Sequence, residues 1–291
     1  MFFVHSINGE KLDSLWKLED KHENNLSPEK AIKILNEIQK TAEKKELPGH
    51  FIKSVTKRIS LDSYRYKNKD EKKIIQLKEE ISTYPPKMQY MSKIILAQWY
   101  WQYFLNNQWN IQNRTIVNSD SIEFQYWDTK RIYREIHEIY QSLLTEKETK
   151  KIPLKEFIPF LNQESSSYSV IDDLYGFSAK KAALFYLSAS EIIPFQQNFS
   201  HYQAMKDFLF HNKSIKKPEN DINIYAWGLY TIQLWKNKTK KDTNEEIEIE
   251  LMKYQYQQAN ALFQMSFEEK ITYLQDLIET YKGKHTAEVY Y

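Results

Sequence analysis

Histidine and carboxylate side chains are the groups best able to bind metals or move protons, and their spacing here suits neither task. His137-Glu138 begins like the zinc-binding HExxH pattern, but Gln141 stands where the second histidine is needed. The other histidines show no ligand spacing: His5, His22, His50, His201, His211 and His285. Because the chain has no cysteine, disulfides, thiolate catalysis and cysteine-ligated zinc are excluded within it. The sequence predicts no metal site and no cofactor.

Serine, acidic and glycine residues give no catalytic motif either. Ser165-Ser166-Ser167 lacks the flanking glycines of a nucleophile elbow. Glu79-Glu80 and Asp172-Asp173 are adjacent pairs, and neighbours on a helix point in different directions, so neither is an obvious acid/base couple. With only 5 glycines the chain has no glycine-rich phosphate loop. We therefore expect no catalytic residue and a protein that is not an enzyme.

Aromatic residues are concentrated in the segment 92–115, the most distinctive part of the sequence. Its rings are Trp99, Tyr100, Trp101, Tyr103, Phe104 and Trp109. Tryptophan and tyrosine can stack on sugars or line a peptide groove, which makes Trp99, Trp101 and Trp109 candidate binding residues. The rings also surround the predicted helix, as in a helix that is buried against more than one neighbour. The core-forming interpretation is favoured.

Composition indicates helices rather than sheets. Five glycines and 8 prolines, nearly all of the prolines between periodic segments, favour helices joined by short loops. The predicted fold is all-α, an antiparallel helical array of the α-solenoid or TPR-like kind without a substantial sheet. No exact 34-residue repeat is present.

Charge and hydropathy argue against nucleic acid as a partner and against insertion into a membrane. Lys+Arg 41 against Asp+Glu 39 gives a formal charge of +2, without the clustered basic face that nucleic acid requires. No window approaches about 18 apolar residues, so direct membrane insertion is not expected. The start MFFVHSINGEKLD lacks the basic region of a signal peptide.

Apolar periodicity and proline positions predict the helices and their limits. The apolar stripes expected to face the core include Ala31, Leu35, Ile38 and Ala42; Ile74, Leu77, Ile81 and Tyr84; and Ile271, Leu274, Ile278 and Tyr281. Ser27 and Asp128 are the predicted N-caps, and the segments 107–121 and 163–169 are predicted loops. A short helix is expected between Pro153 and Pro159. The other helices are expected at about 10–23, 28–42, 51–59, 74–84, 88–106, 129–143, 174–188, 201–211, 225–235, 245–263 and 267–281.

The same pattern suggests a disordered N-terminus at 1–8, an N-terminal helical subdomain at 9–144 and a C-terminal one at 145–291. His285 to Tyr291 look like the first turns of another helix. The chain is therefore expected to be cut from a longer helical array.

Six segments in order carry a resemblance to a known family. They are Leu15-Trp16-Lys17; Ser27-Pro28-Glu29-Lys30-Ala31 with Ile38-Gln39-Lys40-Thr41-Ala42; Phe51-Ile52-Lys53-Ser54; Ala97-Gln98-Trp99-Tyr100-Trp101-Gln102-Tyr103 with Asn113-Arg114-Thr115; Trp127-Asp128 with Tyr140-Gln141-Ser142-Leu143; and Leu174-Tyr175-Gly176-Phe177-Ser178-Ala179. The sequence resembles the N-terminal helical region of large bacterial alpha-2-macroglobulin family proteins of the Bacteroidota type. It departs from the family pattern at Gly176, where an acidic residue is usual.

The resemblance implies a protein of the cell envelope, periplasm or cell surface that traps proteases, that is, an endopeptidase inhibitor. The family's β-sandwich domains, bait region and thioester motif have no counterpart in these 291 residues, so no family catalytic residue is carried over. The expected role is a non-enzymatic helical scaffold or interaction domain, with the downstream macroglobulin domains and target proteases as partners. The alternative is a helical surface protein that binds glycans or peptides through exposed Trp and Tyr.

Overall fold

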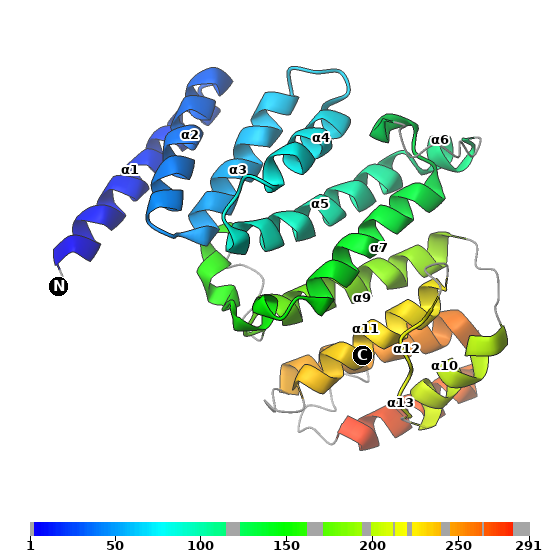
Figure 1. The fold of residues 1–291 in the computed structure, drawn as a ribbon. Helices are drawn as coiled ribbons and strands as arrows, with labels where there is room; N and C mark the ends of the chain where they lie inside the picture. The colour runs from blue at the N-terminus through cyan, green and yellow to red at the C-terminus, as the bar shows by residue number, and fades with distance from the viewer. Residues whose placement is uncertain are drawn as a thin grey trace. The chain divides into compact units, whose positions relative to one another are not determined.

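The computed structural model describes residues 3–114, 123–161, 171–193, 199–211, 213–219, 223–239, 245–263 and 265–281. These residues form the helices α1 to α13 and three short 3-10 helices, and no strand occurs among them (Figure 1). The predicted all-α class is confirmed, whereas the solenoid or TPR-like arrangement stays a prediction. None of the described helices is long and apolar enough to cross a lipid bilayer.

The chain divides into two compact units. Unit 1 comprises residues 1–139 and 152–165, and unit 2 comprises residues 140–151 and 166–291. The division thus falls inside a helix, between Ile139 and Tyr140, where the sequence suggests a boundary after residue 144. Residues 152–165 return to unit 1.

Unit 1 is built on five long helices. They are α1 (Phe3–Asn24), α2 (Pro28–Lys44), α3 (Pro48–Ser63), α4 (Lys69–Ile81) and α5 (Pro86–Asn106). Helices α1 to α4 lie side by side in chain order, and α5 packs against α3 and α4 (Figure 1). Shorter elements follow: α6 (Gln108–Gln112), η1 (Phe124–Tyr126), η3 (Leu154–Phe157), α8 (Ile158–Leu161) and the first part of α7 (Thr129–Thr145).

The apolar stripes that define these helices form the core of unit 1. The α2 stripe Ala31, Leu35, Ile38 and Ala42 is completely buried, as predicted. On α5, Tyr100 and Phe104 are also completely buried, and Tyr100 packs against Phe124 and Trp127 with ring centroids 5.0 and 5.7 Å away. The favoured core role of the aromatic helix is confirmed for these residues.

Two turns of unit 1 share one geometry. Leu26 and Glu46, which are not glycines, adopt φ values of 52° and 51° just before the N-cap residues of α2 and α3. Ser27 occupies the N-cap position of α2, but its side chain makes no capping hydrogen bond; the hydroxyl donates instead to the Asn25 carbonyl at 3.4 Å. The predicted N-cap position of Ser27 is therefore confirmed, whereas the hydrogen bond expected from its side chain is wrong. Asp128 does cap α7, because its Oδ1 accepts from the Arg131 backbone N–H at 2.7 Å.

Several helix limits differ from the predicted ones. Helix α1 begins at Phe3, inside the segment that the sequence suggests to be disordered, and α3 begins at Pro48. Part of the predicted loop 107–121 is the helix α6, because Ile111 is buried and anchors it. The predicted loop 163–169 and the predicted helical start at 285–291 lie outside the described residues.

Unit 2 is built on α9 (Leu174–Ile192), α10 (Phe199–His211), α11 (Ile224–Thr239), α12 (Glu245–Phe263) and α13 (Phe267–Tyr281), with η2 (Glu148–Lys151) against α9. Helix α11 packs on α9, α10 and α12, and α13 packs on α12. The predicted stripe of α13 is wrong at Ile271, which is 42% exposed. Tyr273 and Leu277 face the core instead, and the Tyr273 hydroxyl donates to the Leu209 carbonyl at 3.2 Å.

Replacing Asp173 by alanine is expected to lower the stability of unit 2 by about 1–2 kcal/mol. Asp173 is the buried N-cap of α9: its Oδ1 accepts from the Gly176 backbone N–H at 2.9 Å, and its Oδ2 pairs with Lys238 at 2.7 Å. Thermal unfolding of Asp173→Ala and of its exposed neighbour Asp172→Ala provides the comparison. Equal melting temperatures for the two variants would show that the cap contributes nothing.

Candidate functional site

A groove of about 360 Å³ on unit 1 is the candidate functional site. It is called the Trp99 groove below, and its lining comes from α1, α3, α5 and α8: Glu23, Thr56, Lys57, Ser60, Leu61, Tyr64, Ile95, Gln98, Trp99 and Phe160. The α3 residues among these recur every three or four positions, so one face of that helix forms a wall. The volume lies at the lower end of the range of about 300–1,000 Å³ that small-ligand sites occupy.

Aromatic rings give the groove its apolar character. Trp99 comes from α5, Phe160 from α8, and Tyr64, which is 68% exposed, from the end of α3. The Lys73 ammonium lies 5.3 Å from the centre of the Trp99 ring, and Asp70 holds that ammonium at 3.0 Å. A neighbouring cation therefore lies against the tryptophan ring and favours its position in the groove.

Two polar side chains of the groove have no hydrogen-bond partner within the described part of the chain, the Gln98 carboxamide and the Ser60 hydroxyl. Thr56 differs, because its hydroxyl donates to the Ile52 carbonyl of its own helix at 2.9 Å. A carboxamide both donates and accepts, so Gln98 can pair with the N–H and C=O groups of a bound molecule.

Two lining residues of the groove, Glu23 and Lys57, belong to a cluster of charges. The Lys57 ammonium lies 2.7 Å from Glu19, 2.7 Å from Glu23 and 3.6 Å from Asp20. Glu19 is completely buried, and burial raises its pKa although the hydrogen bond from Lys57 opposes that rise. Burial lowers the pKa of Lys57, but its hydrogen bonds to Glu19 and Glu23 outweigh that effect and raise it. The cluster fastens α1 to α3.

The same three carboxylates are the one group among the described residues with a spacing suited to a metal ion. Oxygens of Glu19, Asp20 and Glu23 lie within 4.8 Å of one another. Two of the three, Glu19 and Glu23, already pair with the Lys57 ammonium at hydrogen-bond distance. We therefore interpret the group as an ion-pair cluster.

The three candidate tryptophans are not brought together. Trp99 lines the groove, whereas Trp101 stacks on Phe104 with ring centroids 5.0 Å apart. Trp109 stands 80% exposed on α6. Of the three, Trp99 is the one that lines the Trp99 groove.

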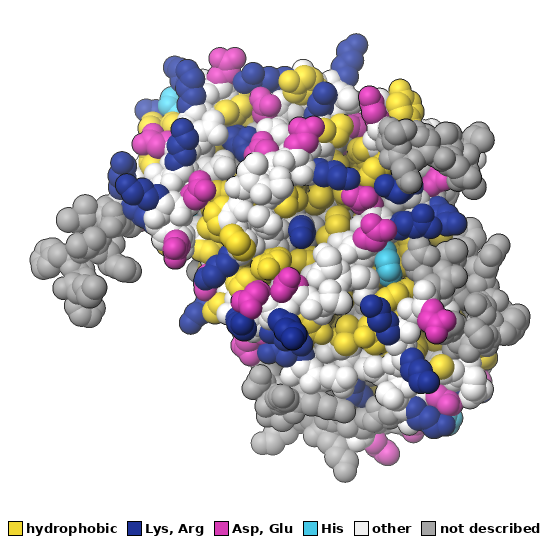
Figure 2. All heavy atoms as spheres, in the orientation of Figure 1, with side chains coloured by type: hydrophobic (Ala, Val, Ile, Leu, Met, Phe, Trp, Pro, Cys, Tyr) yellow, Lys and Arg dark blue, Asp and Glu magenta, His cyan; other side chains and the backbone are white. Residues whose placement is uncertain are grey.

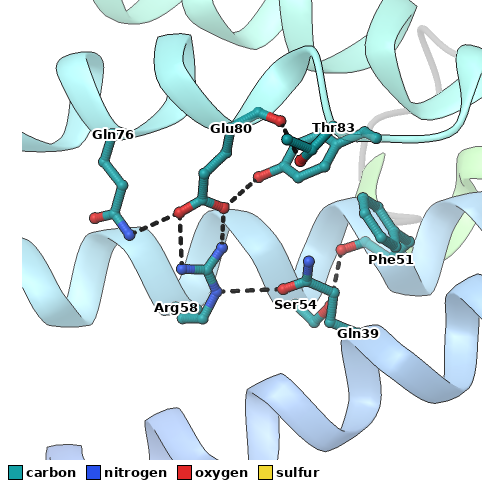
Figure 3. A network of polar contacts seen from close by, with 8 residues as sticks. Gln39, Phe51, Ser54, Arg58, Gln76, Glu80 and Thr83 are labelled. Carbon is teal, nitrogen blue, oxygen red and sulfur yellow. Dashed lines mark hydrogen bonds and ion pairs between the residues drawn. The ribbon is translucent and has the colours of Figure 1, made fainter.

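Glu80, of the adjacent pair Glu79-Glu80, is the centre of a hydrogen-bond network. Glu80 accepts hydrogen bonds from both terminal nitrogens of Arg58, from Gln76 at 2.9 Å and from the Tyr84 hydroxyl at 2.6 Å (Figure 3). Arg58 Nε also donates to Gln39 Oε1 at 3.2 Å. The network joins α2, α3 and α4, and it does not line the groove.

The histidines of interest also have structural roles. His50 Nδ1 accepts from the Trp16 indole N–H at 3.0 Å, and burial lowers the pKa of His50. His137 is buried and stacks on Tyr133, with ring centroids 5.9 Å apart. Ser165-Ser166-Ser167 lies outside the described residues.

Sequence reasoning missed most of the groove. Lys57, Leu61 and Tyr64 lie at helical spacing on one face of α3, but only tertiary packing brings Trp99 and Phe160 to that face. Charged side chains of both signs are interspersed over the face of the molecule in Figure 2, so charge alone did not mark the site. No family model, no curated protein and no solved structure matches this chain.

Proposed function

We propose that the chain is a non-enzymatic helical interaction domain that binds a peptide segment of a partner protein in the Trp99 groove. The supporting observation is that Trp99 and Tyr64 line the same concavity as the unpaired Gln98 carboxamide and Ser60 hydroxyl. Aromatic walls receive apolar side chains, and a carboxamide can pair with both the N–H and the C=O of one residue in an extended segment. Buried polar groups of the bound segment are thereby satisfied.

Within that role we place the chain as the N-terminal part of an alpha-2-macroglobulin-like, protease-trapping protein of the cell envelope. The support is the six ordered sequence segments. The departure at Gly176 has a local cause, since an added Cβ would lie 3.2 Å from Ile171 Cγ2 and 3.5 Å from Asp173 Oδ1. An acidic side chain there would meet a second carboxylate. If the full-length protein neither binds nor slows any protease, the inhibitory part of the proposal is lost.

Binding of a glycan is the second candidate, and it is favoured by the exposure of Trp109 (80%) and Tyr64 (68%). Aromatic faces stack on sugar rings, and side-chain amides bond to sugar hydroxyls. A peptide is preferred because the groove offers a concave site, whereas Trp109 stands alone on α6.

The indole N–H signals of the 7 tryptophans distinguish these candidates in a nuclear magnetic resonance titration. Blocked pentapeptides with a central Leu, Phe, Lys or Glu are one probe set, and chitin and starch oligosaccharides are the other. We expect a peptide to shift the Trp99 signal, assigned through Trp99→Phe, and to leave Trp109 unchanged. Gln98→Ala should weaken binding about fivefold, the effect of one hydrogen bond.

Gln102→Ala is the matched control, because Gln102 lies one turn along the same helix, is exposed and already donates to Asn106 at 2.9 Å. It should bind peptide like the parent protein. A Trp109 shift with oligosaccharides alone would favour the glycan alternative. If no peptide shifts the Trp99 signal, the proposed function is overturned.

A further inference from the structure

The turn between α3 and α4 projects from unit 1 as a basic and aromatic tip. Six consecutive residues, Tyr64 to Lys69, are exposed, and the turn closes one end of the α3–α4 pair (Figure 1). Tyr64 is 68% and Tyr66 46% exposed. Residues 64–72 are called the basic turn below.

Lysine ammoniums lie over both exposed rings of the basic turn. Lys69 Nζ is 5.0 Å from the centre of the Tyr64 ring, and Lys72 Nζ is 5.3 Å from that of Tyr66. Such contacts favour an arrangement in which cations and rings share one surface. The tip therefore presents amphipathic rings and positive charges together.

Three of its cations have no ion-pair partner within the described part of the chain: Lys67, Lys69 and Lys72. The nearby acidic groups are engaged elsewhere. Asp62 and Glu29 lie 3.5 and 3.9 Å from Arg65, and Asp70 pairs with Lys73 at 3.0 Å. Glu71 is half-buried and accepts from the Tyr103 hydroxyl at 3.1 Å. The unpaired charge of the tip is positive.

We propose that the basic turn binds the surface of a lipid bilayer that contains anionic headgroups. A projecting turn can approach a flat surface such as a bilayer, whereas binding of a peptide would require a concave site. Tyrosine is suited to the headgroup region, and anionic lipids attract lysines. The contact is peripheral and reversible, and Tyr64 is the one residue that the basic turn shares with the lining of the Trp99 groove.

Sedimentation with lipid vesicles tests the proposal. The purified chain should bind phosphatidylcholine vesicles that contain phosphatidylglycerol and should not bind vesicles of pure phosphatidylcholine. Lys67→Gln, Lys69→Gln and Lys72→Gln combined should lower the partition coefficient on the order of a hundredfold, since each lysine contributes about fivefold. High salt should remove binding of the parent protein.

The matched control is the triple variant Lys30→Gln, Lys33→Gln and Lys40→Gln, which removes the same charge from exposed, unpaired lysines of α2. It should keep its partition coefficient within a few-fold. An equal loss in both triple variants would overturn the proposal in favour of diffuse charge attraction. Binding of a polyglutamate peptide through the basic turn, without vesicle binding, would overturn it in favour of an acidic protein partner.

Discussion

Replacing Gly49 by alanine is expected to destabilise unit 1 by about 2 kcal/mol, although alanine is the better helix former. Gly49 is the second residue of α3, and the segment 152–161 packs directly on it. A Cβ there would lie 2.6 Å from Pro159 Cδ and 2.8 Å from the Glu156 carbonyl oxygen. A proline ring and a backbone carbonyl cannot rotate away, so η3 and α8 would have to shift.

The sign of the effect decides this prediction. Helix propensity alone favours alanine over glycine by up to about 1 kcal/mol. Urea denaturation gives the stability change, and hydrogen exchange of residues 152–161 shows whether that segment loosens. The control is Glu29→Ala, at the equivalent position after Pro28 in α2, where the side chain is 80% exposed. Stabilisation in Gly49→Ala would contradict the close packing of η3 and α8 on α3.

Helices with long, regular apolar patterns and clear helix-terminating residues at their ends could be predicted from the sequence. The limits of α12 and α13 match the predicted segments 245–263 and 267–281, which are separated by the short segment 264–266. The stripes of α2 and α4 were predicted because i, i+3 and i+4 spacing fixes which residues share a face. Local information suffices where one face alone is apolar.

Turn geometry could not be predicted, because its usual signal is missing. Leu26 and Glu46 hold the left-handed conformation normally given to glycine. The backbone offsets that cost with hydrogen bonds: the Ser27 N–H donates to the His22 carbonyl, and the Leu47 N–H donates to the Ala42 carbonyl, both at 2.9 Å. Although the chain has few glycines, its helices α1 and α2 therefore still end in sharp turns.

The candidate site was less predictable than the fold. Trp99 stood out by residue type, but Trp101 and Trp109 stood out equally, and only packing separates the three. The groove needs residues far apart in the chain, such as Glu23 and Phe160. The same dependence on distant residues explains why the exposure of Ile271 was not predicted. The Tyr273 hydroxyl bonds to the Leu209 carbonyl across the core, so that Tyr273 is the residue that faces inward.

Replacing Arg58 by methionine is expected to cost unit 1 about 2–3 kcal/mol at neutral pH. Methionine keeps much of the apolar stem but leaves Glu80 without its paired cation. The Arg58 side chain is 11% and that of Glu80 27% exposed, so the loss should fall short of that for a completely buried pair. The control Lys151→Met removes the exposed Lys151–Glu148 pair, and its effect on the free energy of unfolding should be too small to measure.

The pH dependence of this loss separates charge from packing. Burial raises the pKa of Glu80, but hydrogen bonds from Arg58, Tyr84 and Gln76 outweigh it and hold that pKa below its ordinary value. Its contribution to stability is therefore complete above the unfolded-state pKa of about 4.3 and is lost as the pH falls through the folded-state value. In Arg58→Met the hydrogen bonds from Arg58 are gone and burial of Glu80 is opposed only by Tyr84 and Gln76. The pKa of Glu80 should therefore be higher in the variant than in the parent protein.

The stabilities of the parent protein and Arg58→Met should consequently begin to converge as the pH falls through the raised pKa of Glu80 in the variant, and meet below its lowered pKa in the parent protein. Glu19, whose pKa is raised, contributes stability that is complete below its unfolded-state pKa and is lost at higher pH, but it does so equally in both proteins and cancels in the difference. Urea midpoints measured across this pH range give the comparison. A loss that stays the same from neutral to acidic pH would mean that the Arg58 stem, and not its charge, joins α3 to α4.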